Sequence, residues 1–230
     1  MNIAAILAGG KGTRMGGNVP KQFLEIGGVP VIILTARKFQ EHPEIDGILF
    51  VCTAEHTGYL KKLTEEYSIT KTIGVIPGGK DRAESSFLAV SRLALNYPRD
   101  TIVLIHDAAR PNVDGRIISD NIREASRLGA CNTVIPSQDT ILRSADGSMV
   151  SGYTDRREMY LVQTPQSFSL GTIYDAHMAC FGRLGITDDC GMVFACGCPV
   201  GLVEGSKANI KITTAEDMEM AALLGKISGK

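Results

Sequence analysis

Short apolar runs recur along the chain, and most are followed by a longer segment whose apolar residues repeat at three- and four-residue spacing. The apolar runs predict strands at 2–8, 47–53, 72–77, 101–106, 132–136 and 200–204. The periodic segments predict helices at 29–41, 57–67, 82–96, 115–128, 169–181 and 214–225. Because the two kinds of segment alternate, we expect an α/β fold in which a mainly parallel, Rossmann-like sheet is flanked by helices.

Residues 137–158 depart from this alternation. The letters ADGS, at 145–148, lie between two short extended stretches, as they would in a β-hairpin. Such a hairpin has little surface to pack against in its own subunit, so burial against a second copy would explain its stability. We therefore expect a single domain over residues 1–230 with a protruding β-arm at about 137–158, and a homodimer in which the arms are exchanged.

Composition narrows the class of protein. The 230 residues are 44% hydrophobic and 21% charged, and the formal net charge is -1. These values are ordinary for a globular protein that buries a sizeable core. A balanced charge argues against a general nucleic-acid or membrane-surface partner, and no apolar run approaches the roughly 18 residues of a membrane span. We expect a cytoplasmic protein that binds neither nucleic acid nor membranes.

The loop after the first predicted strand combines glycine with positive charge. It reads GGKGTRMGG from residue 9, and Lys21 follows it. In an open parallel sheet, ligands bind beyond the carboxyl ends of the strands. Gly9, Gly10 and Gly12 would let successive backbone N–H groups approach a phosphate closely. The sequence therefore predicts a ligand site at this loop.

Four interpretations of the loop compete. It lacks the G-x-x-x-x-G-K-[ST] pattern of a P-loop, which we discard. A dinucleotide-binding fingerprint would end at Met15, where glycine or alanine is expected, so that match is weak. A nucleoside triphosphate loop would use its backbone amides together with the charges of Arg14 and Lys21. A simple strand-to-helix turn with surface cations is the fourth interpretation.

The loop and six later segments together resemble one known family. In chain order the segments are LAGGKGTRMG with PKQF, GGKDRAES (78–85), HDAARP (106–111), QDT (138–140), DRREMYLVQTPQSF (155–168), TDD (187–189) and VEGSKANIKITT (203–214). They resemble the sugar-nucleotide type of nucleotidyltransferase, specifically the cytidylyltransferases that act on 2-C-methyl-D-erythritol 4-phosphate and on ribitol 5-phosphate. Each segment alone is a weak signal, but the collinear set covers essentially the whole chain.

The resemblance implies Mg²⁺-dependent transfer of CMP from CTP to a polyol phosphate, with release of pyrophosphate. A phosphate monoester has a second pKa of about 6, so its attacking oxygen is already largely anionic near neutral pH. The reaction therefore needs cations that bring two anions together more than it needs a dedicated base. The family's catalytic cations match Arg14, Lys21, Arg156 and Lys211.

The resemblance also implies which residues bind each ligand. The CTP-binding positions match Leu7, Ala8, Gly9, Gly10, Gly12, Gly79, Asp81, Arg82 and Ser85. The acceptor-binding positions match Arg110, Thr140, Arg156, Thr164, Thr187 and Lys211. Asp107, at the end of a predicted strand, would bind the metal, and Arg156 would complete a neighbour's site if the arm crosses to it.

Plainer roles remain open for some of these residues. Asp107 could cap a turn, Ser85 could cap the following helix, and Arg156 could be a solvated surface arginine. His106 could orient Asp107, although a hydrogen-bonded core histidine is the more common role for such a residue.

The acceptor is the least determined part of the prediction. HDAARP is similar to the methylerythritol phosphate enzymes, whereas AGGKGTRMG, PKQF and REMY with QTPQSF are similar to the ribitol phosphate enzymes. We favour 2-C-methyl-D-erythritol 4-phosphate because Ala108 and Ala109 lie beside the expected metal ligand. Ribitol 5-phosphate, which would yield CDP-ribitol, is the alternative. A non-catalytic nucleotide-binding module is an alternative of another class, but it would not need acceptor-side cations such as Arg156 and Lys211.

Overall fold

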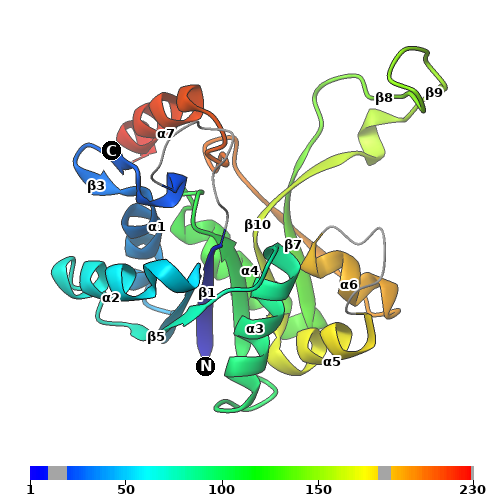
Figure 1. Ribbon diagram of the computed structural model, residues 1–230. Helices are drawn as coiled ribbons and strands as arrows, with labels where there is room; N and C mark the ends of the chain where they lie inside the picture. Colours follow the sequence, from blue (N-terminus) through cyan, green and yellow to red (C-terminus); the bar gives the residue numbers. More distant parts are fainter. Residues whose placement is uncertain (10–19, 181–187, 229–230) are drawn as a thin grey trace.

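A seven-stranded sheet lies at the centre of the computed structural model, which describes residues 1–9, 20–180 and 188–228 (Figure 1). Its strand order is β11-β7-β10-β6-β1-β4-β5. In chain order the strands are β1 (Asn2–Ala8), β4 (Gly47–Cys52), β5 (Thr72–Pro77), β6 (Ile102–Asp107), β7 (Ala130–Pro136), β10 (Tyr160–Ser169) and β11 (Gly201–Glu204). The three pairings that join β6, β1, β4 and β5 are parallel, as is the pairing of β11 with β7.

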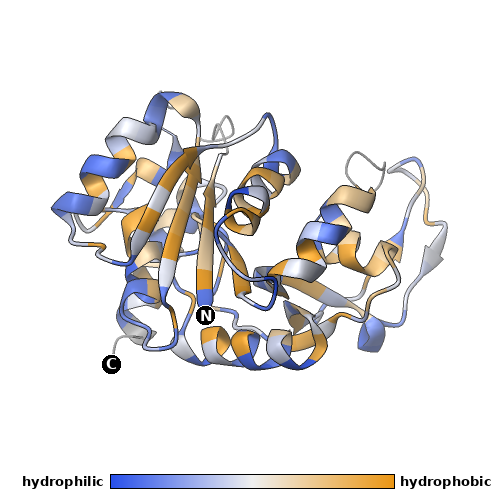
Figure 2. Ribbon diagram, turned by 90° about the horizontal axis from the view of Figure 1, so that it is seen from below, coloured by the Kyte–Doolittle hydropathy of each residue, from blue (hydrophilic) through white to orange (hydrophobic). Residues whose placement is uncertain are grey.

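Helices cover both faces of this sheet. One face packs against α1 (Val31–Gln40), α2 (Thr57–Glu66) and α4 (Gly115–Leu128), and the other against α3 (Arg82–Ala94), α5 (Leu170–Cys180) and α6 (Asp189–Ala195). Successive side chains of a strand point to opposite faces. In β1, Ala4 and Ile6 accordingly join the first core, and Ile3 and Ala5 the second. Figure 2 shows the resulting concentration of hydrophobic residues in the central strands.

The remaining elements are short or peripheral. They are the strands β2 (Glu25–Ile26), β3 (Val29–Pro30), β8 (Leu142–Arg143) and β9 (Gly152–Tyr153), the 3₁₀ helices η2 (Lys21–Phe23), η3 (Ala54–His56) and η4 (Arg156–Glu158), and the helix α7 (Ala215–Ser228). None of the helices in the described part of the chain is long and apolar enough to cross a membrane.

The predicted fold class is confirmed, and the largest omission is one strand. All six predicted strands and all six predicted helices are present, with ends shifted by a few residues. The sequence did not indicate β10, which runs antiparallel to both β6 and β7. Pro165 lies inside β10, and proline normally argues against a central strand. Here it falls where the β10–β7 register shifts, between Val162 and Gln166, so the ladder accommodates it.

The predicted hairpin is also present, and it projects from the body of the molecule (Figure 1). Its strands β8 and β9 pair only with each other, with Leu142 opposite Tyr153. Both of these side chains are exposed, as are Met149 and Val150 near its tip. The arm is therefore an element that buries little of its own apolar surface within one chain.

Candidate functional site

The carboxyl ends of two central strands meet at a cavity. Strands β1 and β6 are parallel neighbours, with Leu7 in register with Asp107. The backbone N–H of Ala108 extends the ladder by donating to the Leu7 carbonyl at 2.9 Å. Beyond these ends lies a cavity of about 300 Å³, lined by Leu7, Ala8, Gly9, Lys21, Gln22, Lys80, Asp81, Arg82, Ser85, Asp107, Ala108, Ala109 and Lys211.

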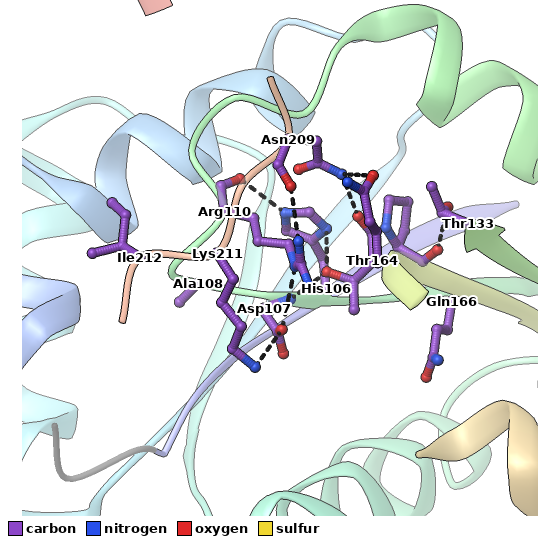
Figure 3. Close-up of polar contacts among 12 residues, drawn as sticks. His106, Asp107, Ala108, Arg110, Thr133, Thr164, Gln166, Asn209, Lys211 and Ile212 are labelled. Atoms are coloured by element: carbon purple, nitrogen blue, oxygen red, sulfur yellow. Dashed lines mark hydrogen bonds and ion pairs between the residues drawn. The ribbon is translucent and has the colours of Figure 1, made fainter. Parts of the chain in front are cut away.

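Asp107 is the charged centre of this cavity, and three cations approach it. Figure 3 shows two of them, Arg110 and Lys211. Asp107 is only 7% exposed. Lys211 Nζ lies 2.8 Å from Oδ2 of Asp107. Arg110 Nε lies 3.5 Å from the same oxygen, and Arg82 Nε lies 3.5 Å from Oδ1. The cavity therefore combines one buried carboxylate with an excess of positive charge.

The electrostatics keep these groups charged. Burial raises the pKa of Asp107, but the neighbouring cations, Lys211 foremost, outweigh burial and hold that pKa well below its usual value. Burial lowers the pKa of Arg82, but Asp189 and Asp107 outweigh that effect and raise it above the ordinary value. Burial is the dominant influence on Arg110, whose pKa is lowered. Asp107 is thus ionised throughout the physiological range.

Buried hydrogen bonds fix the backbone that carries Asp107. The hydroxyl oxygen of Thr164 accepts from the Asp107 backbone N–H at 3.1 Å and lies 3.1 Å from Nδ1 of His106. His106 Nε2 lies 3.1 Å from the carbonyl oxygen of Arg110. Burial lowers the pKa of His106 to about 4, so the ring is neutral at pH 7. With Nε2 protonated, the ring donates to Arg110 and accepts from Thr164, which confirms the prediction of a hydrogen-bonded core histidine.

Two lysines that are far apart in the sequence converge on the same segment. Lys21, at the start of η2, donates through Nζ to the carbonyl of Ile212 at 2.7 Å. Ile212 directly follows Lys211, and its own N–H donates to the Ala109 carbonyl at 2.9 Å. These bonds lay the segment before α7 across the loop after β6. They bring together two predicted catalytic cations, Lys21 and Lys211, at one wall of the cavity.

Arg110 and Thr164 were both predicted to bind the acceptor, but here they form hydrogen bonds to other residues of the chain. Arg110 is 9% exposed, and its Nη1 donates to the carbonyl of Asn209 at 2.8 Å. Asn209 in turn donates through Nδ2 to the Thr164 carbonyl at 2.9 Å. Neither Arg110 nor Thr164 lines the cavity beside Asp107. In this structure they join β10 to the loop after β6.

The opposite wall of the cavity is the start of α3. Asp81 caps this helix, because its Oδ1 accepts from the Glu84 N–H at 2.8 Å. Ser85 Oγ accepts from the Gly79 N–H at 3.1 Å and donates to the Asp81 carbonyl at 2.8 Å. A Cβ added to Gly9 would lie 3.1 Å from that same Oγ, so the β1 loop approaches α3 closely. Of the predicted CTP-binding residues in this segment, Asp81, Arg82 and Ser85 line the cavity, and Gly79 lies behind Ser85 without lining it.

Several predicted site residues do not join this group. Arg156 and Thr140 lie on or beside the arm, are exposed, and do not line the cavity. Arg156 donates through Nη1 to the Gln138 carbonyl at 3.3 Å. The predictions for Gly10, Gly12, Arg14 and Thr187 lie outside the described residues.

The sequence analysis did not identify one buried residue that contacts the cavity wall through Arg82. Asp189 begins α6, is fully buried, and has its Oδ2 2.8 Å from Nη1 of Arg82. The available signal was the TDD segment at 187–189, from which only the threonine was assigned a role.

The donor set at Asp107 fits a magnesium ion that is bound together with phosphates. Within residues 1–9, 20–180 and 188–228, no three His, Cys, Asp or Glu side chains are grouped so that they could hold a metal ion. Mg²⁺ is commonly bound by one or two carboxylates, with substrate phosphates and water as the other ligands. Asp107 supplies one ionised carboxylate at the edge of the cavity, which matches that arrangement rather than an all-protein cage.

Comparisons with known proteins agree over nearly the whole chain. The family model for 2-C-methyl-D-erythritol 4-phosphate cytidylyltransferase (IspD) matches residues 2–225. The enzyme of that name from Clostridium novyi is 39% identical over 95% of this chain and 94% of its own length. Ribitol-5-phosphate cytidylyltransferase from Lactiplantibacillus plantarum is 38% identical, over 97% of this chain and 98% of its own. The crystal structure of the Francisella tularensis 2-C-methyl-D-erythritol 4-phosphate cytidylyltransferase superposes with a TM-score of 0.81 at 28% identity, covering 97% of this chain and 99% of that one.

Proposed function

Because this chain belongs to the 2-C-methyl-D-erythritol 4-phosphate cytidylyltransferase (IspD) family, we propose that it transfers CMP from CTP to the phosphate of a polyol phosphate and releases pyrophosphate. The members of this family are nucleotidyltransferases. The observation that carries the proposal is one cavity that Lys21, Arg82 and Lys211 line together with the ionised Asp107. A reaction between two phosphate anions requires such a concentration of fixed positive charge.

CTP would occupy the cavity between the end of β1 and the start of α3. Both Gly9 and Ser85 line this cavity, and a side chain on Gly9 would crowd Ser85 Oγ, because its Cβ would lie only 3.1 Å away. Backbone groups of Leu7 and Ala8, with Asp81 and Ser85, would meet the polar edges of the cytidine, since a buried base must be matched by hydrogen bonds. Gly79 would support them, because its N–H donates to Ser85 Oγ. Gly10, Gly12 and Arg14 would surround the triphosphate from the loop after β1.

In the chemical step, an oxygen of the acceptor's phosphate would attack the α-phosphorus of CTP. The new P–O bond forms as the bond to the β-phosphate breaks, and the electron pair leaves with pyrophosphate. Lys21, Lys211 and Arg14 would neutralise the negative charge that builds up on the phosphates. Asp107 would bind Mg²⁺, which when bound offsets the charge of the triphosphate oxygens. Asp107 would then give up its 2.8 Å contact with Lys211, whose ammonium group would be available to a phosphate.

We propose 2-C-methyl-D-erythritol 4-phosphate as the acceptor. Support comes from Ala108 and Ala109, small residues that follow Asp107 and line the cavity. Ribitol 5-phosphate is the second candidate, because a ribitol-5-phosphate cytidylyltransferase matches this chain at 38% identity over 97% of its residues.

The test of activity is pyrophosphate release from CTP and Mg²⁺ with a panel of polyol phosphates that contains both candidate acceptors. We expect release with both magnesium and an acceptor present, and the highest kcat/KM for 2-C-methyl-D-erythritol 4-phosphate. A higher kcat/KM for ribitol 5-phosphate would transfer the assignment to that acceptor. No release with any member of the panel would overturn the cytidylyltransferase proposal.

We further propose that one domain spans the chain and that the arm completes the site of a second copy. In support, Arg156 and Thr140 are exposed, on or beside an arm that projects from the body, and exposed apolar residues cover that arm. Mixing Arg156→Ala with Asp107→Asn separates the possibilities, because only a mixed dimer built in trans contains an intact site. Random pairing then restores about a quarter of wild-type activity, since half of the dimers are mixed and each has one site of two. A mixture that stays inactive, or an active monomer, contradicts arm exchange.

A further inference from the structure

Arg82 lies between two carboxylates, and the nearer one is outside the cavity. Its Nη1 is 2.8 Å from Oδ2 of Asp189, whereas its Nε is 3.5 Å from Oδ1 of Asp107. Asp189 is fully buried and does not line the cavity, while the Arg82 side chain is 29% exposed and does. The firm contact of this arginine is thus to the core, and its weak contact is to the proposed metal ligand.

Asp189 is itself held from several elements. Ser86, one turn after Arg82 on α3, donates through Oγ to Oδ1 of Asp189 at 2.6 Å. His177 of α5 has Nε2 3.5 Å from the same oxygen. The backbone N–H of Asp189 donates to Oε1 of Gln166, on β10, at 3.3 Å. Both oxygens of Asp189 are therefore engaged, and the carboxylate is a fixed point where α3, α5, α6 and β10 meet.

We infer that Asp189 is a positioning residue for the nucleotide site. This inference rests on the proposed function. A guanidinium group has five N–H donors in a rigid plane. Because Asp189 fixes Nη1, the plane is set, and the N–H groups on Nε and Nη2 remain available at the cavity wall. Their partners, Asp107 and Gln166, are both at 3.5 Å, so phosphate oxygens of CTP can displace them.

Asp189 also keeps Arg82 from pairing fully with Asp107. Without the charge of Asp189, Asp107 is the remaining ion-pair partner of Arg82 among the described residues, and a two-bond ion pair between them would form across the cavity. That pair would occupy the carboxylate proposed to bind magnesium and the guanidinium proposed to bind phosphate. Loss of Asp189 should therefore weaken binding of the magnesium complex of CTP and leave binding of the acceptor unchanged.

The test compares Asp189→Asn with its neighbour Asp188→Asn. Asp188 caps α6 by accepting from the Gly191 N–H at 2.8 Å, and its other oxygen accepts from Nε2 of Gln166 at 2.6 Å. It has no direct contact with Arg82 among the described residues, so this control removes a nearby negative charge without removing a hydrogen bond to Arg82. Asparagine is an equally good cap. We expect Asp189→Asn to raise KM for CTP about tenfold or more, the size of losing a charged hydrogen bond. KM for the acceptor should change less than about twofold, and Asp188→Asn should leave both constants within about twofold.

A double-mutant cycle then assigns the effect to Arg82. In an Arg82→Gln background, Asp189→Asn should add less than about twofold to KM for CTP, because the group it positions is already gone. Additive effects, an equal effect of Asp188→Asn, or an equal rise in the acceptor's KM would each overturn the inference. If Asp189→Asn does not fold, Ser86→Ala keeps the charge of Asp189 but removes the 2.6 Å hydrogen bond to it and a 3.3 Å contact to Nε2 of His177, and it should raise KM for CTP about threefold. An unchanged KM in that variant overturns the inference as well.

Binding measurements separate this inference from the proposed reaction. Calorimetric titration of CTP with Mg²⁺, without acceptor, reports on the nucleotide site alone. If the wild type releases no pyrophosphate but binds CTP, the proposed reaction fails and the tenfold difference in Kd between Asp189→Asn and Asp188→Asn still decides the role of Asp189. If the wild type does not bind CTP at all, both proposals are wrong.

Discussion

The cavity beside β1 and the arm at about 137–158 differ in what holds their functional side chains in place. Around the cavity, Asp107, Thr164 and His106 are buried and bonded to one another, so the core of one chain fixes their positions. On the arm, Arg156 is exposed, and its side chain donates to the Gln138 carbonyl at 3.3 Å. The core of one chain therefore holds the cavity, where we propose that the nucleotide binds, whereas the position of Arg156 depends on what the arm packs against.

The two regions also differ in what a mutation removes. Near Asp107, polar groups are buried, so removing one leaves its partner without a hydrogen bond and lowers stability. On the arm, water can replace a lost partner, so under the proposed function the same change should lower activity without lowering stability. The experiments below use matched pairs of substitutions to contrast the two regions.

The largest effect is expected for Lys211→Ala. This change removes a cation that lies 2.8 Å from Asp107 and that we propose meets a phosphate in the transition state. Loss of one such group lowers kcat by about 10²–10³-fold. Lys207→Ala is the matched control, because Lys207 is on the same segment but is exposed and donates to Gln138 outside the cavity. Steady-state kinetics should find the control near wild type, and a Lys211→Ala enzyme that retains most of its kcat contradicts the assigned role.

Arg156→Ala should have the next largest effect, and it tests the arm directly. We expect kcat/KM for the acceptor to fall about 100-fold, as for the loss of a charge-assisted contact to a phosphate. The midpoint of thermal unfolding should not move, because Arg156 is exposed. Arg157→Ala is the control, since that neighbouring guanidinium pairs with Asp155. If both arginine variants behave alike, Arg156 is a surface residue and the arm does not contribute it to a site.

The sequence predicted some features of these two regions and missed others. The alternating apolar runs predicted the parallel core, because burial in a sheet demands a local pattern. The hairpin was visible from its turn residues. Asp189 was not recognised, because its partner Arg82 is 107 residues away and a buried ion pair leaves no local pattern. For β10, Gln163 and Gln166 are buried against polar partners, which a hydrophobic pattern cannot indicate.

A smaller effect is expected in the pH dependence of the free energy of unfolding, through His106 beside the cavity. Burial lowers the pKa of His106 to about 4, against about 6.5 when unfolded, so the folded state disfavours its protonation. The stability that neutral, buried His106 contributes to the folded protein is fully present above pH 6.5. It is lost as the pH falls from 6.5 towards 4. Between pH 7 and 5 the loss amounts to about 2 kcal/mol. Urea unfolding of wild type and His106→Asn at both pH values should show a smaller decline in the variant by about that amount, whereas equal declines would place His106 outside the buried network.

The smallest effect is expected from removing one hydroxyl group. Thr164→Val leaves the Asp107 N–H and His106 Nδ1 without their shared partner, and an unsatisfied buried group costs about 1–3 kcal/mol in the free energy of unfolding. Thr140→Val makes the same chemical change at an exposed position beside the arm, where the cost should be within about 0.5 kcal/mol. Urea unfolding at pH 7 measures both. If the two variants lose equal stability, the buried hydrogen bonds of Thr164 do not hold the residues beside the cavity in place. The two regions would then not differ in the stability that their hydrogen bonds provide.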